Sequence, residues 1–375
     1  MSAPRLLHVF STFNLGGPQA RAVQLINAWG PAYKHMIVSV ERGELAARER
    51  LQVEANFPLF PDLKSGALPG RLMALRSRIA QLRPDLVLTY NWGAVEVVMA
   101  RRLFGGAPLV HHEDGFGTEE SESLYRRRTW FRRQAFGAAH QIIVPSRALE
   151  RIASETWRQP AARVTYIPNG VDLPAFGIKP QANAIPGFVA DDRLVVGTVA
   201  GLREEKNLTR LVRAFATAAR DLPARLVIVG DGPDREAILA EARAQGLADR
   251  VHLPGFMSNP ERYVGLFDVF ALSSDTEQFP ISLVEAMAAS LPAASTAVGD
   301  IKDIVTPDNL PFVTPPRDET ALAAAIRALL VDPDLRRRIG AANRARVESE
   351  FSLTSMIARY KQIYDAALSE GRERK

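Results

Sequence analysis

Two glutamates separated by seven residues, Glu277 and Glu285, form the strongest chemical pattern in the chain. A strand is predicted before them at Asp268–Leu272, and a helix is predicted over Ile281–Ser290. One carboxylate should therefore lie in a loop and the other about one turn into a helix, whose first amides attract anions. Carboxylates accept hydrogen bonds from sugar hydroxyls, so the segment could hold a phosphorylated sugar. The same spacing also fits a solvated loop residue and a helix-surface charge.

Two cations three residues apart, Arg203 and Lys206, follow a predicted strand at Leu194–Ala200. The next helix is predicted over Leu208–Arg220, with Asn207 as its N-cap. An arginine can grip a diphosphate through two parallel hydrogen bonds, whereas a lysine acts as a point charge. Cations at a helix start oppose the helix dipole, so stability alone does not favour them there. We therefore favour diphosphate binding over solvated surface charges.

Glycines mark three further strand ends. Gly16 and Gly17 follow the first predicted strand, Gly230 follows Arg225–Val229, and Gly255 with Phe256 follows Val251–Leu253. Glycine lets a backbone approach a ligand closely, although most glycine turns are merely turns. The first turn lacks the G-x-G-x-x-G spacing of a dinucleotide site. A fourth strand end, His111-His112-Glu113-Asp114-Gly115, offers acid and base groups, but no third metal ligand can be assigned from the sequence.

Short β-rich apolar runs alternate with longer helical patterns in both halves of the chain. The first half predicts strands at Arg5–Phe10, Tyr33–Val40, Asp85–Tyr90, Pro108–His112, Gln141–Pro145 and Arg163–Ile167, and helices at Ala20–Trp29, Leu68–Leu82 and Ala94–Phe104. The second half adds a strand at Ala293–Thr296 and helices at Glu319–Leu330, Pro333–Glu350 and Thr354–Leu368. This alternation predicts an α/β protein with parallel sheets covered by helices and ligands at the carboxyl ends of the strands.

A chain of 375 residues is long enough for about two domains. The stretch Asp172–Asp192 is rich in Pro, Gly, Ala and Asn and shows no period, so we interpret it as a linker. We accordingly expect a first doubly wound domain over residues 1–175 and a second over residues 190–350.

The amino-acid composition restricts the expected cellular location and the expected partners. The chain contains no cysteine, which excludes disulfides and thiolate metal sites and makes a reducing cytoplasm the expected location. A net charge of +5 and a pI of about 9.6 suit an anionic partner. We expect no nucleic acid, because no recognisable motif for it is present. No apolar run reaches the roughly 18 residues of a membrane span, and no signal-peptide pattern precedes the first strand.

Taken in order, these segments resemble the retaining GT-B glycosyltransferases of the fourth family in the usual sequence classification, also called glycosyl transferases group 1. The matching pieces are Ile167-Pro-Asn-Gly-Val-Asp172, Gly201-Leu-Arg203 with Lys206-Asn207, Val229-Gly-Asp-Gly-Pro233, Leu253-Pro-Gly255, Glu277 with Glu285, and Phe351-Ser352 with Tyr360 and Tyr364. The resemblance covers nearly the whole chain and is strongest from Val164 to Val298. It implies two Rossmann-like domains facing across a cleft, with a helix at residues 352–370 crossing back to the first domain.

The resemblance also implies residue roles in binding a nucleotide-sugar donor. Arg203 and Lys206 would bind the diphosphate. Glu285 would accept hydrogen bonds from the ribose hydroxyls, and Glu277 from the transferred hexose. The remaining implied donor-binding positions are Gly16, Gly17, Gly230, Gly255, Phe256, Phe279, Pro280 and Ile281.

Two departures from the family pattern affect this assignment. Relatives usually have Glu-Gly-Phe-Gly where this chain has Glu277-Gln-Phe-Pro280, and the proline removes a backbone donor near the sugar. The family commonly places His-Gly after the strand that here begins at Pro108, and that His slot falls on Asp114, with His112 two residues earlier. Both are catalytic candidates, and the sequence leaves open which of them faces the reacting carbon.

We expect transfer of a hexosyl-type group, with anomeric retention implied by the resemblance. Arg203 and Lys206 could do the work that a metal does elsewhere, and the only D-x-D, Asp332-Pro-Asp334, is interpreted as a capping turn. We therefore expect neither a metal nor another cofactor. The alternatives are a non-catalytic nucleotide-sugar or glycan-binding protein, and a sugar-nucleotide epimerase or phosphorylase on a similar scaffold.

A basic stretch with two aromatics, Arg126–Arg133, bears on the acceptor. Basic helices with aromatic residues can lie on anionic membranes, although Trp130 and Phe131 could instead face the core of a solvated helix. In relatives the first domain binds the acceptor, and several relatives modify lipid-linked sugars. Our working hypothesis is an enzyme at the inner face of the membrane that extends a glycan or lipid-linked acceptor in polysaccharide or glycolipid assembly.

Overall fold

The chain divides into two compact units. The computed structural model describes residues 3–115, 125–188 and 191–373. The first unit comprises Met1–Pro168 and Met356–Lys375, and the second comprises Asn169–Ser355. Residues 169–175, which we expected in the first domain, therefore belong to the second unit.

The first unit is built on a seven-stranded sheet of parallel strands with the order β3-β2-β1-β4-β5-β6-β7. The strands are β1 Arg5–Phe10, β2 Lys34–Ser39, β3 Ala55–Asn56, β4 Leu86–Tyr90, β5 Leu109–His112, β6 Gln141–Val144 and β7 Val164–Tyr166. Successive side chains of a strand point to opposite faces, so a buried parallel sheet needs helices on both sides. The two-residue strand β3 is too short for a hydrophobic pattern to indicate it.

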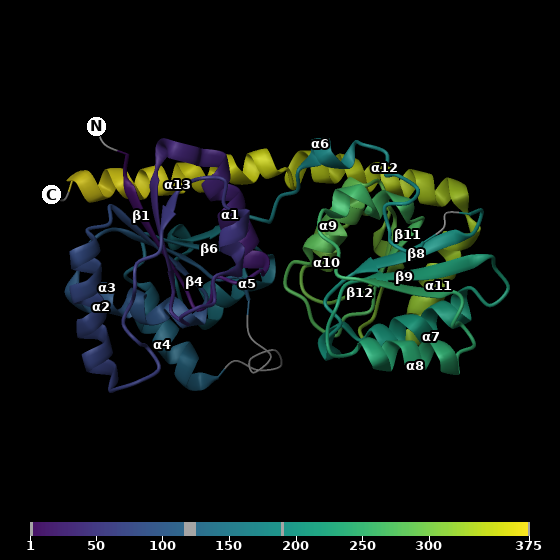
Figure 1. The fold of residues 1–375 in the computed structure, drawn as a ribbon, viewed down its shortest axis with the longest axis horizontal. Helices are drawn as coiled ribbons and strands as arrows, with labels where there is room; N and C mark the ends of the chain where they lie inside the picture. The colour runs from purple at the N-terminus through teal and green to yellow at the C-terminus, as the bar shows by residue number, and fades with distance from the viewer. Residues whose placement is uncertain (1–2, 116–124, 189–190, 374–375) are drawn as a thin grey trace. The chain divides into compact units, whose positions relative to one another are not determined.

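Helices cover both faces of this sheet (Figure 1). They are α1 Gly17–Trp29, α2 Leu68–Leu82, α3 Val95–Phe104, α4 Arg126–Phe136, α5 Arg147–Arg151 and the C-terminal α13 Leu353–Glu373. On one face, Leu7 and Val9 of β1 share a core with α2, α3 and α4. On the other, Trp29 of α1 meets Tyr364 of α13 edge to face, with ring centroids 5.3 Å apart. The last helix therefore packs on the first unit.

A cluster of buried histidine and tyrosine side chains occupies the sheet face that α13 covers. His8 Nε2 lies 3.1 Å from His35 Nδ1, and His8 Nδ1 lies 3.1 Å from Tyr90 Oη. Burial lowers the pKa of His35 to about 4 and that of His8 well below its usual value. These rings are neutral at physiological pH and serve as hydrogen-bonded packing groups.

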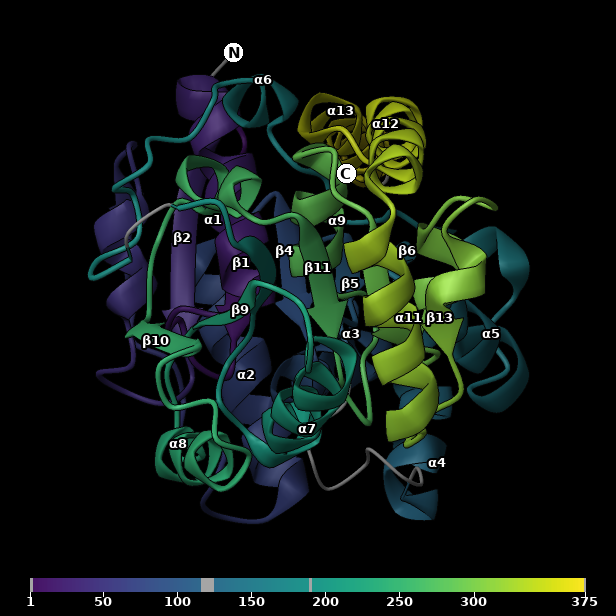
Figure 2. The same ribbon diagram turned by 90° about the vertical axis from the view of Figure 1, so that its right-hand side faces the viewer.

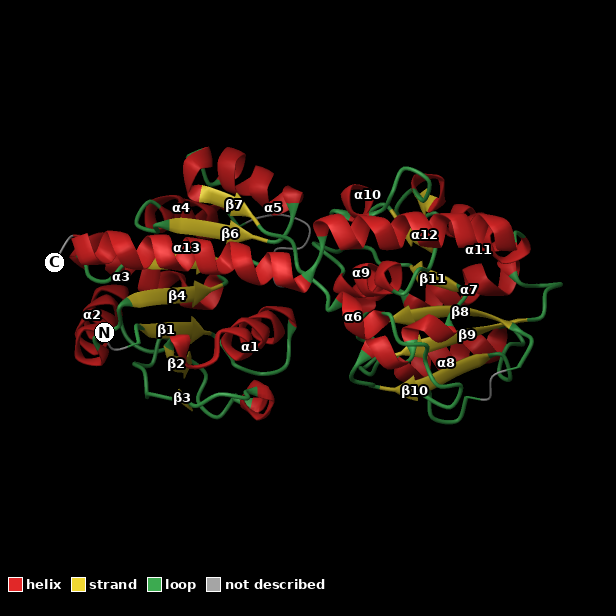
Figure 3. Ribbon diagram, turned by 90° about the horizontal axis from the view of Figure 1, so that it is seen from above, coloured by secondary structure: helices red, strands yellow, loops and turns green. Residues whose placement is uncertain are grey.

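The second unit contains a six-stranded parallel sheet with the order β10-β9-β8-β11-β12-β13, and Figure 3 shows β10, β9, β8 and β11 side by side. The strands are β8 Leu194–Val199, β9 Ala224–Val229, β10 Val251–Gly255, β11 Val269–Leu272, β12 Ala293–Thr296 and β13 Val313–Thr314. The helices are α6 Leu173–Phe176, α7 Leu208–Ala218, α8 Arg235–Ala244, α9 Ile281–Ala288, α10 Ile301–Ile304, α11 Glu319–Val331 and α12 Pro333–Glu350. Helices α7, α8 and α11, which Figure 2 labels, share a core with one sheet face, and α9 and α10 share a core with the other.

The stretch Asp172–Asp192 is part of the second unit, so its interpretation as a linker is wrong for the residues described. Ile185 and Phe188 are buried in the same core as Val171 and helix α9. Apolar side chains in a stretch rich in proline and glycine can be buried without a regular period, and the sequence pattern therefore gave no sign of this packing.

The predicted α/β class is confirmed, with two helix-covered parallel sheets. Strands β1 and β12 and helices α2 and α12 coincide with the predicted ranges. Within the residues described, no helix combines the length and the apolar character that a membrane span requires.

Candidate functional site

The second sheet changes winding direction at β8, which has β9 on one side and β11 on the other. Such a switch point leaves a crevice at the carboxyl ends of the strands, where doubly wound sheets bind their ligands. The loop after β8 carries Arg203 and Lys206, and the loop after β11 carries Glu277. Adjacent strands therefore position the predicted cations and the first predicted carboxylate.

Lys206 and Glu277 form an ion pair across this switch point, with Nζ and Oε1 2.6 Å apart. The Ser274 hydroxyl donates to the same Oε1 at 2.8 Å. Only 15% of the Lys206 side chain and 10% of the Glu277 side chain are exposed, so salt screens the pair weakly. The structure thus brings into direct contact two residues that the sequence assigned to different parts of a ligand.

A second ionic contact fastens the same two loops together. Asp275 accepts from Arg210 Nη1 at 2.6 Å through Oδ1, and from Asn207 Nδ2 at 3.0 Å through Oδ2. The Ser273 hydroxyl contacts the backbone carbonyls of Lys206 and Asn207, each at 2.9 Å. Sequence analysis missed Ser273, Asp275 and Arg210, because a polar residue beside a motif carries no spacing signal of its own.

Arg203 differs from Lys206 in its exposure. Its side chain is 58% exposed, and its Nε lies 3.1 Å from Glu205 Oε1. An exposed ion pair of this kind adds little stability. The guanidinium can therefore exchange Glu205 for a ligand phosphate at small cost.

Gly230 and Gly232 press the loop after β9 against the loop that carries Arg203. Gly230 has a φ of 147°, and a Cβ there would lie 1.8 Å from the carbonyl oxygen of Ala200. Gly232 has a φ of 154°, and its Cβ would lie 2.4 Å from the carbonyl oxygen of Leu202. Only glycine fits at such distances. Gly230 is thus buried against the neighbouring backbone and positions the Arg203 loop.

Gly255 and Phe256 lie at the carboxyl end of β10. The Gly255 carbonyl accepts from the Gly230 amide at 2.9 Å. Phe256 is 67% exposed, and an exposed aromatic ring at a strand end can stack on a planar base.

The segment Phe279–Ile281 leads into α9, with Pro280 as the N-cap residue. The Phe279 side chain is buried edge to face against Phe351, with ring centroids 5.7 Å apart, so only its backbone can face a ligand. The first amides of a helix have no partner within it, and Pro280 itself has no N–H. The donors that this helix start offers an anion therefore begin at Ile281.

Glu285 is largely buried one turn into α9. Burial, with a smaller contribution from Glu261, raises the pKa of its carboxyl group to about 8. Among the residues described, no cation or hydrogen-bond donor is paired with this carboxyl group. A buried carboxyl group without a protein partner is costly, and such groups are typical of ligand sites.

In the first unit, the predicted glycines lie at the start of α1. Gly16 is the N-cap residue, and both Gly16 and Gly17 are exposed. A Cβ on Gly17 would meet no atom within 4 Å, so a ligand can approach this backbone closely.

The two catalytic candidates of the first unit have different surroundings. Both oxygens of Asp114 are bound by Arg21 of α1, one of them at 2.9 Å. His112 donates from Nδ1 to the Thr89 carbonyl at 3.0 Å and accepts at Nε2 from the Tyr364 hydroxyl at 2.8 Å. Burial, followed by the charge of Arg21, lowers the His112 pKa well below its usual value. His112 is therefore a packing residue with neither nitrogen left for a substrate, which favours Asp114.

A cavity of about 450 Å³ opens near the carboxyl ends of β1, β2 and β4. The residues that decide its chemistry are Glu41, Lys64, Arg71, Trp92, Glu96 and Arg127. Arg71 binds both oxygens of Glu96, at 2.6 and 3.0 Å. The Arg128 guanidinium lies over the indole of Trp92, 5.2 Å from the ring centroid, and Arg127 is exposed at the same cavity, so the cavity combines an aromatic surface with positive charge. This combination suits a sugar-bearing or anionic molecule.

Helix α4 contains the basic stretch Arg126–Arg133. Arg132 is buried, and Phe131 packs edge to face against Trp92 with ring centroids 5.9 Å apart. Trp130 is 59% exposed, and Arg126 is also exposed. Of the two aromatics, therefore, only Phe131 turns towards the core.

The Asp332-Pro-Asp334 segment caps α12. Asp332 accepts from the Leu335 amide at 2.9 Å, and Asp334 pairs with Arg337. The described part of the chain contains no group of three or more His, Asp or Glu side chains suited to hold a metal ion.

Comparison with known proteins places the chain in a family. Residues 15–174 match the family model of Glycosyltransferase Family 4, and residues 183–346 match that of Glycosyl transferases group 1. The N-acetyl-alpha-D-glucosaminyl L-malate synthase of Bacillus anthracis is 28% identical over 346 residues, which cover 92% of this chain and 82% of the relative. A GDP-mannose-dependent alpha-(1-6)-phosphatidylinositol monomannoside mannosyltransferase of Mycobacterium tuberculosis is 30% identical over 307 residues, covering 78% of this chain and 79% of the relative.

The solved structure of Anabaena Alr3699/HepE in complex with UDP shares the fold, with a TM-score of 0.78 at 20% identity. The match covers 96% of this chain and 100% of that one.

The pH dependence of stability tests the environment of Glu285. Its pKa is 4.5 when unfolded and about 8 when folded, so the folded second unit binds more protons between these values. The contribution of Glu285 to the free energy of unfolding should be fully present below pH 4.5 and fall by on the order of 4 kcal/mol as the pH rises to 8. Urea unfolding across this range measures the slope. Glu285→Gln should flatten it, exposed Glu236→Gln should not, and equal slopes in all three proteins would contradict the assignment.

The matched family models, the relatives and the arrangement of cations and carboxylates at the switch point agree: the chain belongs to the group 1, family-four glycosyltransferases, enzymes of GT-B fold that use nucleotide-sugar donors.

Proposed function

We propose that this enzyme transfers a hexosyl-type group from a nucleoside diphosphate sugar to a glycan or lipid-linked acceptor, with retention of anomeric configuration and without a metal ion. The observation that carries the proposal is the largely buried Lys206–Glu277 pair at the switch point, in the same loops as the exposed Arg203. This pair joins, through one hydrogen bond, a cation and a carboxylate that can accept hydrogen bonds from sugar hydroxyls. A diphosphate joined to a sugar offers an anion to the cation and hydroxyl groups to the carboxylate.

In this proposal Arg203 and Lys206 bind the donor diphosphate. Arg203 exchanges its contact with Glu205 for phosphate oxygens, whereas Lys206 is already held by Glu277. Negative charge on the leaving nucleoside diphosphate grows as the glycosidic bond breaks. Cations fixed beside it lower the barrier, typically by about 3 kcal/mol for each such donor. The UDP in the Anabaena structure supports a nucleoside diphosphate as the leaving group.

The carboxylates bind the two ends of the donor. Both described contacts of the Glu277 side chain engage Oε1, so Oε2 remains for a hydroxyl of the transferred sugar. Glu285 binds the ribose hydroxyls, which offset the cost of burying its carboxyl group without a protein partner.

We infer that the anomeric configuration is retained because the acceptor hydroxyl attacks the anomeric carbon from the face that the leaving group departs from. The leaving phosphate takes the proton of that hydroxyl. Arg21 binds both oxygens of Asp114, which makes this carboxylate a poor covalent nucleophile and a suitable stabiliser of positive charge at the anomeric carbon. No role for Arg21 was predicted from the sequence. The only indication in the sequence is a basic residue in the first turns of the helix that begins at Gly17.

The acceptor is proposed to bind the first unit in the 450 Å³ cavity beside Trp92 and Arg127. The names of two relatives include L-malate and a phosphatidylinositol mannoside, and both molecules are anions. The exposed Trp130 and Arg126 on α4 support a peripheral contact with the anionic inner face of the membrane. A role in polysaccharide or glycolipid assembly is consistent with such an acceptor.

Replacing Lys206 by methionine should lower turnover about 100- to 1,000-fold, because the variant loses a fixed cation beside the leaving group. The double variant Lys206→Met/Glu277→Gln removes the unpaired buried charge, so it should recover stability without recovering activity. Exposed Lys302→Met is the matched control. Donor titration calorimetry and steady-state rates measure these effects, and wild-type turnover in Lys206→Met would refute the diphosphate site.

Activity should survive chelation, because Arg203 and Lys206 supply the positive charge at the leaving group. Rates measured with excess EDTA test this expectation. A loss of activity that a divalent ion restores would contradict metal-independent transfer.

The freshly formed product should keep the anomeric configuration of the donor. Proton NMR of the anomeric signal, recorded before mutarotation or further reaction, measures it directly. An inverted product would exclude same-face attack.

A further inference from the structure

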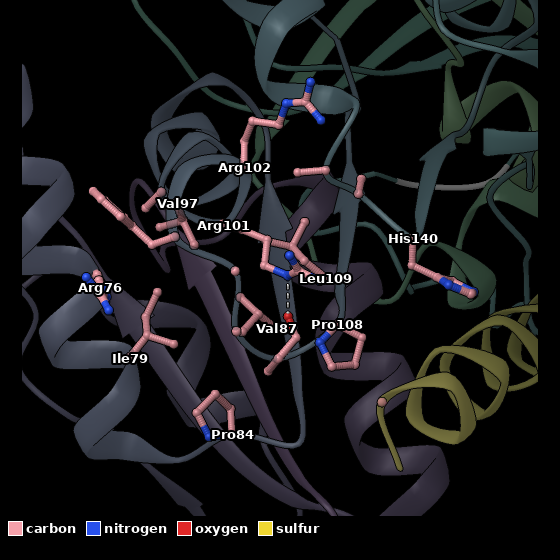
Figure 4. A pocket seen from close by; sticks show the side chains of 18 of the residues that line it. Arg76, Ile79, Pro84, Val87, Val97, Arg101, Arg102, Pro108, Leu109 and His140 are labelled. Carbon is pink, nitrogen blue, oxygen red and sulfur yellow. Dashed lines mark hydrogen bonds between the residues drawn. The ribbon is translucent and has the colours of Figure 1, made fainter. Parts of the chain in front are cut away.

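A second cavity of the first unit, about 870 Å³ in volume, lies at the amino ends of the strands (Figure 4). Asp85, Pro108 and His140, which directly precede β4, β5 and β6, line it. Gly16 and Asp114 lie beyond the opposite, carboxyl ends of their strands. The cavity is therefore separate from the edge at which doubly wound sheets carry out their chemistry.

The floor of this cavity is apolar. The lining includes the buried Val87 of β4, Val97 of α3 and Leu109 of β5, which Figure 4 shows grouped about Arg101, and the partly exposed Ile79, Phe104 and Pro108. Arg101 donates from Nε to the Ala107 carbonyl at 2.8 Å, which holds it across this floor. The volume falls within the range of roughly 300–1,000 Å³ found for sites that bind small molecules.

Arginines dominate the charge of the lining. The lining contains two carboxylates, Asp85 and Glu370, and six arginines: Arg5, Arg76, Arg83, Arg101, Arg102 and Arg163. Both carboxylates are paired with other residues of the lining: Asp85 accepts from the Arg5 backbone amide at 2.9 Å and lies 4.0 Å from Arg5 Nε, and Glu370 pairs with His140. A concave surface with this excess of positive charge concentrates anions.

Two of the arginines converge beside Gly137. The Nη1 atoms of Arg102 and Arg163 lie 4.0 and 3.8 Å from the position that a Cβ on Gly137 would take. Arg163 Nη1 donates to the Gly137 carbonyl at 2.8 Å, which orients the guanidinium but leaves its charge. Both side chains are exposed, and guanidinium groups bind phosphate oxygens through parallel hydrogen bonds, so a phosphate near Gly137 would lie within reach of both.

Helix dipoles account for only part of this cluster. Arg101 and Arg102 lie in the last turn of α3, and Arg83 is the C-cap of α2, where cations are stabilising. Arg163 donates to the carbonyl of Gly137, the C-cap of α4, so it too lies at a helix C-terminus, whereas Arg5 and Arg76 do not.

We propose that this cavity binds a phosphorylated molecule with an apolar portion. The phosphate lies between Arg102 and Arg163, and the apolar portion lies against Ile79, Phe104 and Pro108. An anionic phospholipid and a soluble phosphate ester share this chemistry. The proposal does not depend on the donor site of the second unit.

Calorimetry with tripolyphosphate tests the site in a Lys206→Met background, which weakens the donor diphosphate site. Into this background we introduce either Arg102→Ala/Arg163→Ala or the control Arg50→Ala/Arg151→Ala. Arg50 and Arg151 are exposed on the same unit and line neither cavity, so both pairs remove the same charge. The cavity variant should bind tripolyphosphate about a hundredfold more weakly than its parent, because each arginine contact is worth roughly tenfold in affinity. The control should bind as its parent does.

Co-sedimentation with phosphatidylglycerol vesicles, alongside phosphatidylcholine vesicles, identifies the source of the phosphate. Loss of phosphatidylglycerol binding in Arg102→Ala/Arg163→Ala, but not in the control, supports a lipid headgroup. Weakened tripolyphosphate binding with unchanged vesicle binding supports a soluble phosphate ester. Equal binding of both probes by folded cavity and control variants, as judged by circular dichroism, would overturn the proposal.

Discussion

The ion pair between Lys206 and Glu277 is the contact on which the site of the second unit depends. Two charges withdrawn from water must remain paired, because removing either one leaves the other buried and unpaired. The loops after β8 and β11 are therefore held in one arrangement, which Arg210 and Asp275 reinforce. Gly299 adds a third restraint, since a Cβ there would lie 2.4 Å from the Glu277 carbonyl oxygen. The site is thus organised during folding, and little reorganisation remains for the moment of reaction.

Two charged groups of the second unit have no such buried ion-pair partner among the residues that the structure describes, and a ligand could supply one. Arg203 keeps only an exposed contact with Glu205, and Glu285 is partly buried with a raised pKa. These two groups lie in different elements, the loop after β8 and helix α9, on either side of the fixed pair in the sequence. A donor with a diphosphate between two hydroxyl-bearing sugars would satisfy both groups at once. The paired and unpaired charges together are the ones that the proposed nucleotide-sugar donor would require.

The first unit shows how packing reassigns a candidate acid or base. His112 and Asp114 are two residues apart and lie on the same side of the sheet, because the Arg21 that binds Asp114 lies 5.6 Å from the ring of Tyr360, which also stacks on His112. Their partners separate their roles: α13 holds His112 through Tyr364, and α1 holds Asp114 through Arg21. The hydroxyl of Tyr364 on α13 donates to Nε2 of His112, so this nitrogen is not available to a substrate.

The amino-acid sequence suffices to indicate the α/β class, most strand and helix ranges and the family, because periodicity and ordered motifs are local properties. It also places Arg203, Lys206, Glu277 and Glu285 correctly at strand ends and helix starts. It does not reveal that Lys206 pairs with Glu277, that Tyr364 bonds to His112, or that Ile185 and Phe188 belong to a core. The first two contacts join residues 71 and 252 positions apart, and which strands and helices become neighbours selects the partners. No local pattern encodes that choice, since it follows from the packing of the whole unit.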